Sequence, residues 1–285
     1  MGGSGGISLS TYRNHHRDVP GQGGLSLSDY RSTSGPKTFN IPMVAGQTLT
    51  KSTLAAQSSC DDGAIVTVNL TGNCYGLGSW AYLIRTDTFW NMTINNHGNI
   101  IGHAGYGGTG ATNNHATAGG QHGQGGSAGL YFWPCTNTTF NNYGKIVSGG
   151  GGGGGGGRGA YYVYVSGFKG SNGYNQWHYG GGGGGGGGAG YGGTAGSRGS
   201  GVTSGTNGTA GSAYGYGTGG YGQLMPNGTT RGGWGGRGGV NGGNGLPGTA
   251  ADGGYGGAGS PYATAHRTRV TFINRSGGSV SGGFN

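Results

Sequence analysis

The sequence contains no glutamate, and charged residues make up only 7% of its 285 positions. Ordinary soluble domains carry roughly 25% charged residues, and disordered chains usually depend on charge for solubility. This composition therefore argues against a charge-rich disordered chain. Only Asp61 and Asp62 among the acids are adjacent, and neighbouring strand residues point to opposite faces. Because no nucleophile motif is present either, we expect no catalytic site and no enzyme.

Cysteine, histidine clusters and long apolar runs are also scarce. The three cysteines are Cys60, Cys74 and Cys135. Their odd number and the absence of CxxC spacing argue against a disulfide scaffold or a zinc knot. Four histidines occur in a short span, without HxH or HxxxH spacing: His97, His103, His115 and His122. We therefore expect no metal and no cofactor, and, since no run approaches roughly 18 apolar residues, no membrane insertion.

The N-terminus and the charge pattern indicate where the protein is synthesised and which kinds of surface attract it. The segment Met1-Gly-Gly-Ser-Gly-Gly has no basic region and no apolar core, so we expect no signal peptide and synthesis in the cytoplasm. The net charge of +9 comes from singly scattered cations, which favours general attraction to anionic surfaces such as lipopolysaccharide. Arg-Gly-Gly elements at Arg231 and Arg237 resemble RNA-binding segments, but without clustered arginines we expect no nucleic-acid partner.

Glycine dominates what is present, with 82 residues. It does not recur at every third position and there are only 7 prolines, which excludes collagen. A flexible linker is the usual interpretation of glycine runs, yet 18 Tyr, 5 Trp and 7 Phe require organisation. We therefore expect the glycines to form packed structure.

Residues 1–36 contain a duplicated motif. Gly6-Ile-Ser-Leu-Ser-Thr-Tyr-Arg13 is echoed by Gly24-Leu-Ser-Leu-Ser-Asp-Tyr-Arg31. The alternation of apolar residues with serine has a period of two, so each copy could add a short strand to a partner's sheet, although a floppy N-terminus is the alternative. We predict that this segment docks on a partner through Leu9, Tyr12, Arg13, Leu27, Tyr30 and Arg31.

The pattern of residues 37–148 predicts a β domain. Apolar runs at 64–70 and 80–84 are bounded by Gly, Asp and Asn, as expected of strands. A unit of strand, Asn-rich turn with Gly, short strand and glycines occurs at 89–102 and 138–148, with a looser copy at 270–283. Recurrence of this unit predicts a short β-solenoid or β-sandwich-like domain to which 266–285 returns as a C-terminal strand. No stretch has helical periodicity, so we predict an all-β, glycine-rich fold with essentially no α-helix.

Residues 149–265 are the glycine-rich body. Gly149–Gly157 and Gly180–Gly188 are each nine uninterrupted glycines, and Gly-Gly-x spacing follows elsewhere. An extended helix with three residues per turn rises about 3.1 Å per residue and offers three faces. Glycine on every inward face lets several such helices pack in contact. We predict a bundle of polyglycine II-type helices, with all-glycine rods in the centre and Gly-Gly-x rods outside.

Two of these units carry a family resemblance. Thr93-Ile-Asn-Asn-His-Gly-Asn-Ile-Ile-Gly and Thr139-Phe-Asn-Asn-Tyr-Gly-Lys-Ile-Val-Ser-Gly-Gly-Gly resemble the "TI-NNG-I-GGGG" segments of glycine-rich bacteriophage tail-fibre and tail-tip receptor-binding proteins. The strand over 62–70 and the Ser-Leu-Ser-Asp-Tyr-Arg element are similar to parts of the same proteins. The resemblance implies a virion tail protein whose rigid glycine-rich domain binds a host receptor. A long aromatic insert between the two nine-glycine runs departs from the family pattern.

That insert, residues 158–179, is the best candidate for a binding site. Tyr, Trp, Ser, Gly and Asn combine amphipathic rings with adaptable hydrogen bonds, as in antibody loops, and aromatic faces stack on sugars. The alternative is that some of these rings only cover the bundle as a local core. Candidate receptor-binding residues, with two from a later loop, are Tyr161, Tyr162, Tyr164, Phe168, Lys169, Tyr174, Trp177, His178, Tyr179, Tyr216 and Tyr221.

The sequence thus predicts a non-enzymatic tail-fibre or tail-tip adhesin of a virion. Its expected partners are a host cell-surface receptor, either a glycan or an outer-membrane protein, and other tail proteins, with a homo-trimer as the expected assembly. A purely structural virion or extracellular filament protein is the main alternative. An ice-binding protein would require a regular Thr or Ala face, which is not evident, and an RGG-type RNA binder is the fourth hypothesis.

Overall fold

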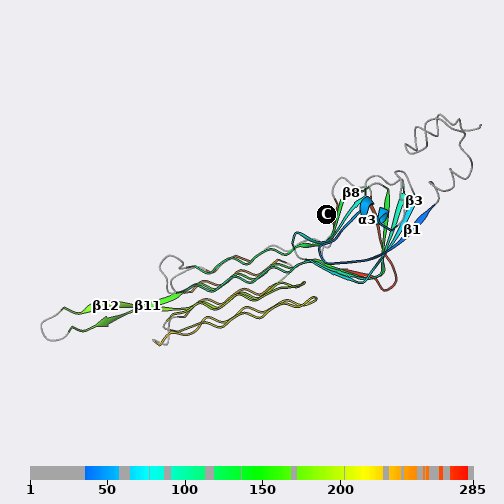
Figure 1. The fold of residues 1–285 in the computed structure, drawn as a ribbon. Coiled ribbons are helices and arrows are strands. Elements are labelled where there is room, and N and C mark those ends of the chain that lie inside the picture. The colour runs from blue at the N-terminus through cyan, green and yellow to red at the C-terminus, as the bar shows by residue number, and fades with distance from the viewer. Residues whose placement is uncertain are drawn as a thin grey trace, which may run out of the picture.

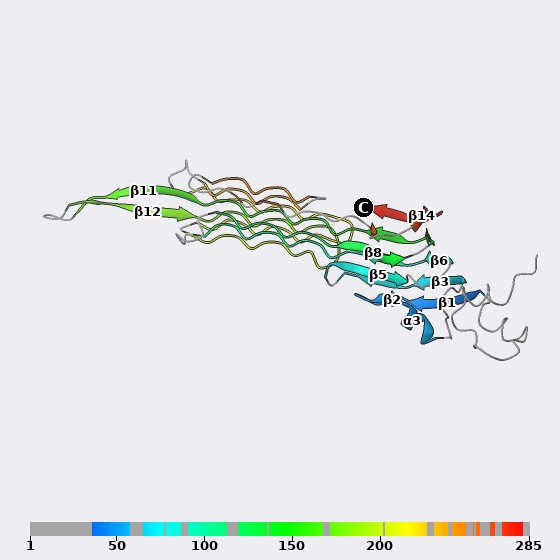
Figure 2. The same cartoon turned by 90° about the horizontal axis from the view of Figure 1, so that it is seen from above.

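The computed structural model shows a β body from which a long arm extends, ending in a hairpin (Figure 1). The arm is glycine-rich and runs away from the sheets in both views (Figures 1 and 2). The structure describes residues 36–57, 65–76, 78–86, 91–112, 119–135, 137–167, 172–201, 203–226, 231–238, 241–248, 253, 255–256, 263–265 and 270–281.

The β body consists of three open parallel sheets. The first has the order β1 (Lys37–Pro42), β3 (Ile65–Thr71), β6 (Asn91–Asn96), β9 (Thr138–Asn142) and β14 (Val270–Asn274). The second has the order β15 (Ser279–Ser281), β10 (Lys145–Val147), β7 (Asn99–Ile101) and β4 (Asn73–Tyr75). The third has the order β13 (Ala263–Ala265), β8 (Ala128–Cys135), β5 (Trp80–Thr86) and β2 (Thr48–Thr50). Successive passes of the chain therefore supply neighbouring strands to each sheet.

The core lies between the sheets and is made of matching residues from successive passes. In the first sheet, Val68 pairs with Ile94, which pairs with Phe140, and Phe140 pairs with Phe272. The rings of Phe140 and Phe272 are stacked with centroids 5.3 Å apart. Phe132 of the third sheet meets Phe140 edge to face at 5.6 Å and joins the sheets across the core. This alternation of apolar and polar residues matches the period of two that the sequence predicts.

Asparagines form two hydrogen-bonded ladders at the ends of the first-sheet strands. The inner ladder joins buried Asn96 and Asn142 to exposed Asn274: Asn96 Nδ2 donates to Asn142 Oδ1 (2.8 Å), and Asn142 Nδ2 donates to Asn274 Oδ1 (2.9 Å). The outer ladder runs Asn40, Asn69, Asn95 and Asn141, with amide donor–acceptor distances of 2.9 Å at each step. In each ladder the amide nitrogen of one asparagine donates to the amide oxygen of the asparagine on the adjacent pass, so the ladders help to fix the register of the sheet.

Helix is almost absent from the described residues, which contain α3 (Lys51–Ala55). Thr50 caps this helix, since its hydroxyl accepts from the Thr53 backbone N–H and the Thr53 hydroxyl accepts from the Thr50 N–H. Buried Leu54 anchors the helix to the core. The prediction of an all-β chain with essentially no α-helix is confirmed.

The glycine arm is an insertion at one corner of the β body. The chain leaves after β7, returns to β8, leaves again after β10 and returns to β13. The corresponding corner of the preceding pass, between β4 and β5, spans only residues 76–79. The arm begins earlier than the expected boundary at residue 149, because residues 102–112 and 119–127 already belong to it. In these two segments the glycines are separated by larger residues such as Tyr106 and Thr109, so the sequence shows no glycine run at the start of the arm. The arm also ends before residue 265, since Ala263–Ala265 is β13 of the β body.

Backbone hydrogen bonds between neighbouring segments of the arm repeat at every third residue. The N–H groups of Gly105, Gly108 and Ala111 donate to the carbonyls of Gly150, Gly153 and Gly156. The carbonyls of the same three residues, Gly105, Gly108 and Ala111, accept from the N–H groups of a different segment, Gly188, Gly185 and Gly182. Successive residues of a segment therefore face different neighbouring segments. Residues three positions apart face the same neighbour.

The two nine-glycine runs lie at the centre of the arm. All residues of 149–157 and 181–188 are buried. Segment 181–188 bonds to segments 102–111, 149–157, 193–201, 203–212, 216–224 and 231–238. A Cβ added to Gly185 would overlap the carbonyl oxygen of Gly153, and one added to Gly153 would overlap that of Gly236. Close approach of backbones therefore requires glycine at these positions.

Candidate functional site

A two-stranded antiparallel hairpin projects from the far end of the arm, opposite the β body (Figures 1 and 2). It consists of β11 (Gly159–Val165) and β12 (Tyr174–Gly180), paired from Gly159 with Gly180 to Val165 with Tyr174. These strands continue the two central nine-glycine runs without a break. The most deeply buried segments of the arm thus hold the hairpin in position.

Large aromatic side chains occupy both faces of the hairpin. Directly paired residues share a face, so Tyr162, Tyr164, Trp177 and Tyr179 lie on one face. Tyr161, Tyr174 and His178 lie on the other. The exposed fractions are 64% for Tyr164, 60% for Tyr162 and Tyr174, and 55% for Trp177. Within the described residues, the hairpin is therefore paired along its backbone but leaves four large rings mostly open to solvent.

Ring contacts organise these side chains across the two strands. Tyr162 and Trp177 meet edge to face with centroids 5.4 Å apart, and Trp177 stacks with Tyr179 at 6.5 Å. On the opposite face, Tyr161 stacks on His178 at 5.3 Å. An isolated two-stranded hairpin is only marginally stable in water, so these contacts help to keep it folded.

Arg158 lies at the base of the hairpin, directly before β11. Its guanidinium carbon is 4.4 Å from the centroid of the Tyr179 ring. The side chain is 8% exposed, and its Nε and Nη1 atoms have no hydrogen-bond partner in the part of the chain that the structure describes. The cation–π contact therefore offsets part of the cost of burying this charge and joins the hairpin to the arm.

The structure brings together most but not all of the predicted receptor-binding residues. Seven of them share the hairpin: Tyr161, Tyr162, Tyr164, Tyr174, Trp177, His178 and Tyr179. Tyr216 instead follows a turn near the β body, and Tyr221 lies along the side of the arm against Trp234, with centroids 4.9 Å apart. Phe168 and Lys169 lie outside the described residues, as do the predicted docking residues Leu9, Tyr12, Arg13, Leu27, Tyr30 and Arg31.

Tyr216 is separated from the hairpin because the chain runs back and forth along the arm. Segment 203–212 returns to the base of the arm, where the turn over 213–215 reverses it into segment 216–224. Sequence patterns show an aromatic loop here but not the end of the arm at which it lies.

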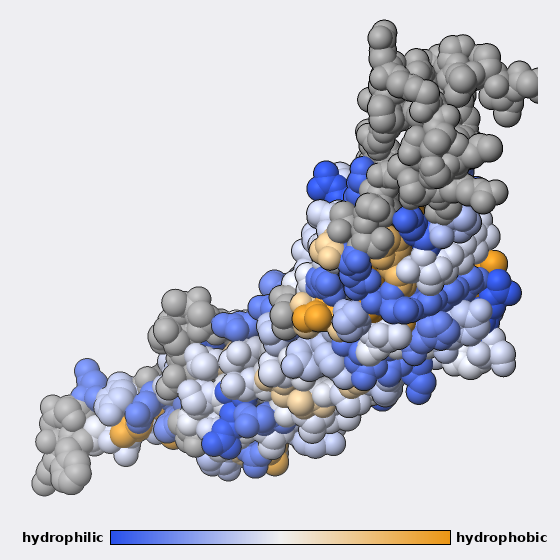
Figure 3. Space-filling model, turned by 45° about the vertical axis from the view of Figure 1, so that its right-hand side comes forward, coloured by the Kyte–Doolittle hydropathy of each residue, from blue (hydrophilic) through white to orange (hydrophobic). Residues whose placement is uncertain are grey.

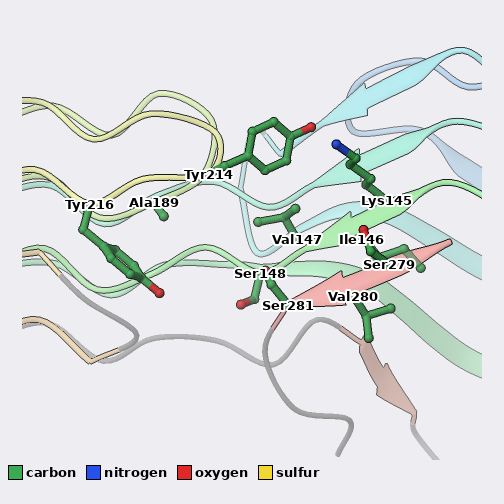
Figure 4. A pocket seen from close by; sticks show the side chains of 10 residues that line it. All are labelled: Lys145, Ile146, Val147, Ser148, Ala189, Tyr214, Tyr216, Ser279, Val280 and Ser281. Atoms are coloured by element: carbon green, nitrogen blue, oxygen red, sulfur yellow. The ribbon is translucent and has the colours of Figure 1, made fainter. Parts of the chain in front are cut away.

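A pocket lies at that base, between the β body and the arm (Figure 4). Its volume is about 310 Å³. It is lined by Lys145, Ile146, Val147, Ser148, Ala189, Tyr214, Tyr216, Ser279, Val280 and Ser281. The Lys145 ammonium stands 5.0 Å from the Tyr214 ring centroid. Sequence reasoning missed this site, because its residues come from passes of the chain that are distant in sequence.

On the face of the molecule seen in Figure 3, hydrophilic and weakly polar residues cover most of the β body and the arm, and hydrophobic residues are scattered. Among the described residues, no group of three or more His, Cys, Asp or Glu side chains could hold a metal ion. No helix in this part of the chain is long and apolar enough to cross a membrane.

The two described cysteines, Cys74 and Cys135, are buried. Burial raises the pKa of the Cys74 thiol to about 11, although nearby backbone groups of Gly46 and Gln47 act in the opposite direction. The Cys74 thiol donates to the carbonyls of Ala81 (2.9 Å) and Val44 (3.1 Å). It is therefore a neutral structural thiol rather than a reactive nucleophile.

Comparison with known proteins gives one structural likeness. No family model matches the chain, and no curated protein matches it. The chain is similar to a chain of the gp37–gp38 adhesin tip complex of the bacteriophage S16 long tail fibre, with 21% identity and a TM-score of 0.44. The likeness covers 97% of this chain and 92% of the other.

Proposed function

We propose that this protein is a bacteriophage tail-fibre or tail-tip adhesin that binds a host cell-surface receptor through its aromatic hairpin. The observation that carries the proposal is the exposure of Tyr162, Tyr164, Tyr174 and Trp177 on a hairpin at the end of the arm. Several exposed rings gathered on one projecting element mark an interaction site, and Tyr and Trp supply contact area at low cost in side-chain entropy.

The arm supports this role as a rigid spacer. We propose that its segments are polyglycine II-type helices, since backbone hydrogen bonds recur at every third residue and successive residues bond to different neighbours. The resulting network fixes both central runs, and they continue directly into β11 and β12. Receptor contacts would therefore be made by a hairpin whose base is held in place before binding, which reduces the entropy lost on association.

The β body supports attachment to the rest of the particle. We propose that it is a short β-solenoid, because each pass of the chain adds one strand to neighbouring positions of the parallel sheets. Its sheets are open, and the edge strands β1, β2, β14 and β15 can accept further strands. The duplicated segment before residue 36 is the proposed docking element for another tail protein, and a homo-trimer is the proposed assembly.

The chemistry of the hairpin fits a glycan or an outer-membrane protein as receptor. Ring faces stack on sugars, whereas phenol and indole groups supply hydrogen bonds to either type of partner. The net charge of +9 favours approach to an anionic bacterial surface. The proposed role is binding without catalysis, in keeping with the dispersed aspartates of the sequence.

A purely structural role in the virion is the second candidate. It is favoured by one observation, that most of the arm is committed to its own backbone packing. A structural protein has no need of exposed rings at the far end of the arm, so the two functions differ in what they require of the hairpin.

Binding to cells separates the two candidates. The fluorescently labelled chain is incubated with the bacterium on which the parent phage grows and with a phage-resistant strain, and bound protein is counted by flow cytometry. The adhesin predicts saturable binding to the sensitive strain and competition with phage adsorption. Equal, non-saturable association with both strains would favour the structural role.

A further inference from the structure

We propose that the pocket at the base of the arm binds an acidic monosaccharide unit, a sugar ring that carries a carboxylate. This site is distinct from the hairpin, and the inference does not depend on the hairpin's role. The pocket joins Lys145–Ser148 at the end of the second sheet, Ser279–Ser281 of the last strand, and Tyr214 and Tyr216 from the arm (Figure 4).

The frame of the pocket is held by backbone contacts. Ser212 and Gly215 exchange hydrogen bonds of 2.8 and 3.3 Å across the turn that carries Tyr214. The Gly190 N–H donates to the Ser212 carbonyl (2.9 Å), which ties this turn to the end of a central glycine run. On the other side, β10 and β15 pair in parallel from Lys145 with Ser279 to Val147 with Ser281. The pocket is therefore formed before any ligand arrives.

The lining combines an apolar floor with serine hydroxyls. Ile146, Val147 and Ala189 are buried, with exposed fractions of 0%, 6% and 6%. Ser148, which is half-buried, and Ser279 and Ser281, which are exposed, contribute the hydroxyls. Apolar ring edges and several hydroxyls are the groups that a sugar meets with its own C–H faces and hydroxyls.

The two ends of the pocket differ in character. Tyr214 and Lys145 lie at one end, and Tyr216 lies at the other with Ser148 and Ser281 (Figure 4). Tyr216 is 37% exposed and makes no ring contact with another described residue, so its face is free to stack on a sugar. A sugar ring against Tyr216 would direct a substituent toward Lys145.

The ammonium of Lys145 selects an acidic ligand. It stands over the Tyr214 ring, 5.0 Å from the ring centroid. A carboxylate placed beside it gains a charge-assisted hydrogen bond that a neutral sugar cannot make. The pocket volume of about 310 Å³ is at the small end of the range for ligand sites, about 300–1,000 Å³, and suits one sugar ring rather than an oligosaccharide.

Titration of the full-length protein with free sugars tests the proposal. Glucuronic acid and N-acetylneuraminic acid are compared with glucose, with binding followed by amide chemical-shift changes and saturation-transfer NMR. We expect saturable shifts at Val280 and Ser281, with at least one acidic sugar bound about fivefold or more tightly than glucose. Lys145→Gln should remove this preference, whereas Tyr216→Ala should weaken all sugars about tenfold or more.

Two controls make the result decisive. Tyr174→Ala changes an exposed hairpin tyrosine and should leave sugar binding intact even where it abolishes cell binding. Inorganic phosphate serves as the anion probe. Absence of saturable sugar binding, binding unaffected by Tyr216→Ala, or saturation by phosphate alone would each overturn the proposal. Unchanged circular dichroism and melting temperature in each variant show that the pocket's frame is retained.

Discussion

Tyr162 and Trp177 face each other across the hairpin, with ring centroids 5.4 Å apart and ring planes at 65°. Both rings are more than half exposed, so their mutual contact covers only part of each face. Stabilisation of the hairpin explains why the rings are adjacent, but not why so much of their surface remains open. The open area is the part of the pair that a receptor can cover.

The first prediction concerns this pair. Trp177→Ala should weaken receptor binding by about 2 kcal/mol, roughly thirtyfold, because large aromatic side chains dominate binding energy at interfaces. Cell-binding isotherms of the purified protein provide the measurement. Tyr255→Ala is the matched control, since Tyr255 is an exposed ring on the arm that stacks on His122 rather than on the hairpin. Equal losses from both substitutions would show that the hairpin has no special role.

The second prediction concerns the packing of the arm. Gly153→Ala and Gly185→Ala should each lower the free energy of unfolding by at least about 2 kcal/mol, because the new methyl group overlaps a backbone carbonyl that cannot easily move. Urea denaturation followed by circular dichroism measures the change. At Gly78, an added Cβ meets no atom within 4 Å, so Gly78→Ala should be neutral or slightly stabilising. Tolerance of alanine at positions 153 and 185 would be incompatible with a close-packed arm.

The third prediction concerns the inner asparagine ladder. The Asn142 amide donates to Asn274 Oδ1 and to the Ser279 carbonyl (3.3 Å), and its oxygen accepts from Asn96. Asn142→Ala should cost about 2–4 kcal/mol of unfolding free energy, because it removes three hydrogen bonds made by a fully buried amide. Asn69→Ala, in the half-exposed outer ladder, should cost less than about 1 kcal/mol. A cost as small at position 142 would mean that the ladder does not hold the passes together.

The fourth prediction concerns pH. The pKa of Cys74 is raised to about 11 by burial, from an unfolded value near 9.0, so the folded state favours the neutral thiol. The neutral thiol contributes fully to the free energy of unfolding below about pH 9. As the pH rises toward 11, this free energy falls by on the order of 2 kcal/mol. The raised pKa of buried Tyr82 acts in the same direction at still higher pH. Urea denaturation at pH 7, 9 and 10.5 measures this loss. Cys74→Ala should flatten the dependence, and an identical slope in that variant would assign it to other groups.

Strand positions and turns could be predicted from the sequence because they depend on local patterns. Alternating residues such as Val66, Val68 and Leu70 mark a strand with one buried face, and the Asn-Asn-x-Gly turns mark where it ends. The uninterrupted nine-glycine runs mark positions where no side chain is needed, and in the structure every residue of these runs is buried. These features require no knowledge of distant contacts.

The layout of the arm and the pocket could not be predicted in the same way. Whether Tyr216 lies at the hairpin end or at the base depends on how many times the chain reverses, and short turns such as 213–215 carry only a weak signal. The pocket needs Lys145, Tyr214 and Ser281 to meet, and only the three-dimensional arrangement of separate passes brings them together. The earlier start of the arm at residue 102 escaped prediction because its glycines alternate with larger residues.

The central claim is that the hairpin binds the receptor while the arm only holds it in place. Replacing residues 160–179 by Asn-Gly closes the chain between the paired Gly159 and Gly180 and leaves both central runs unchanged. The variant should keep the melting temperature and β content of the parent chain but lose saturable binding to host cells and the ability to block phage adsorption. Undiminished binding by the folded variant would contradict the account and would place receptor recognition elsewhere on the molecule.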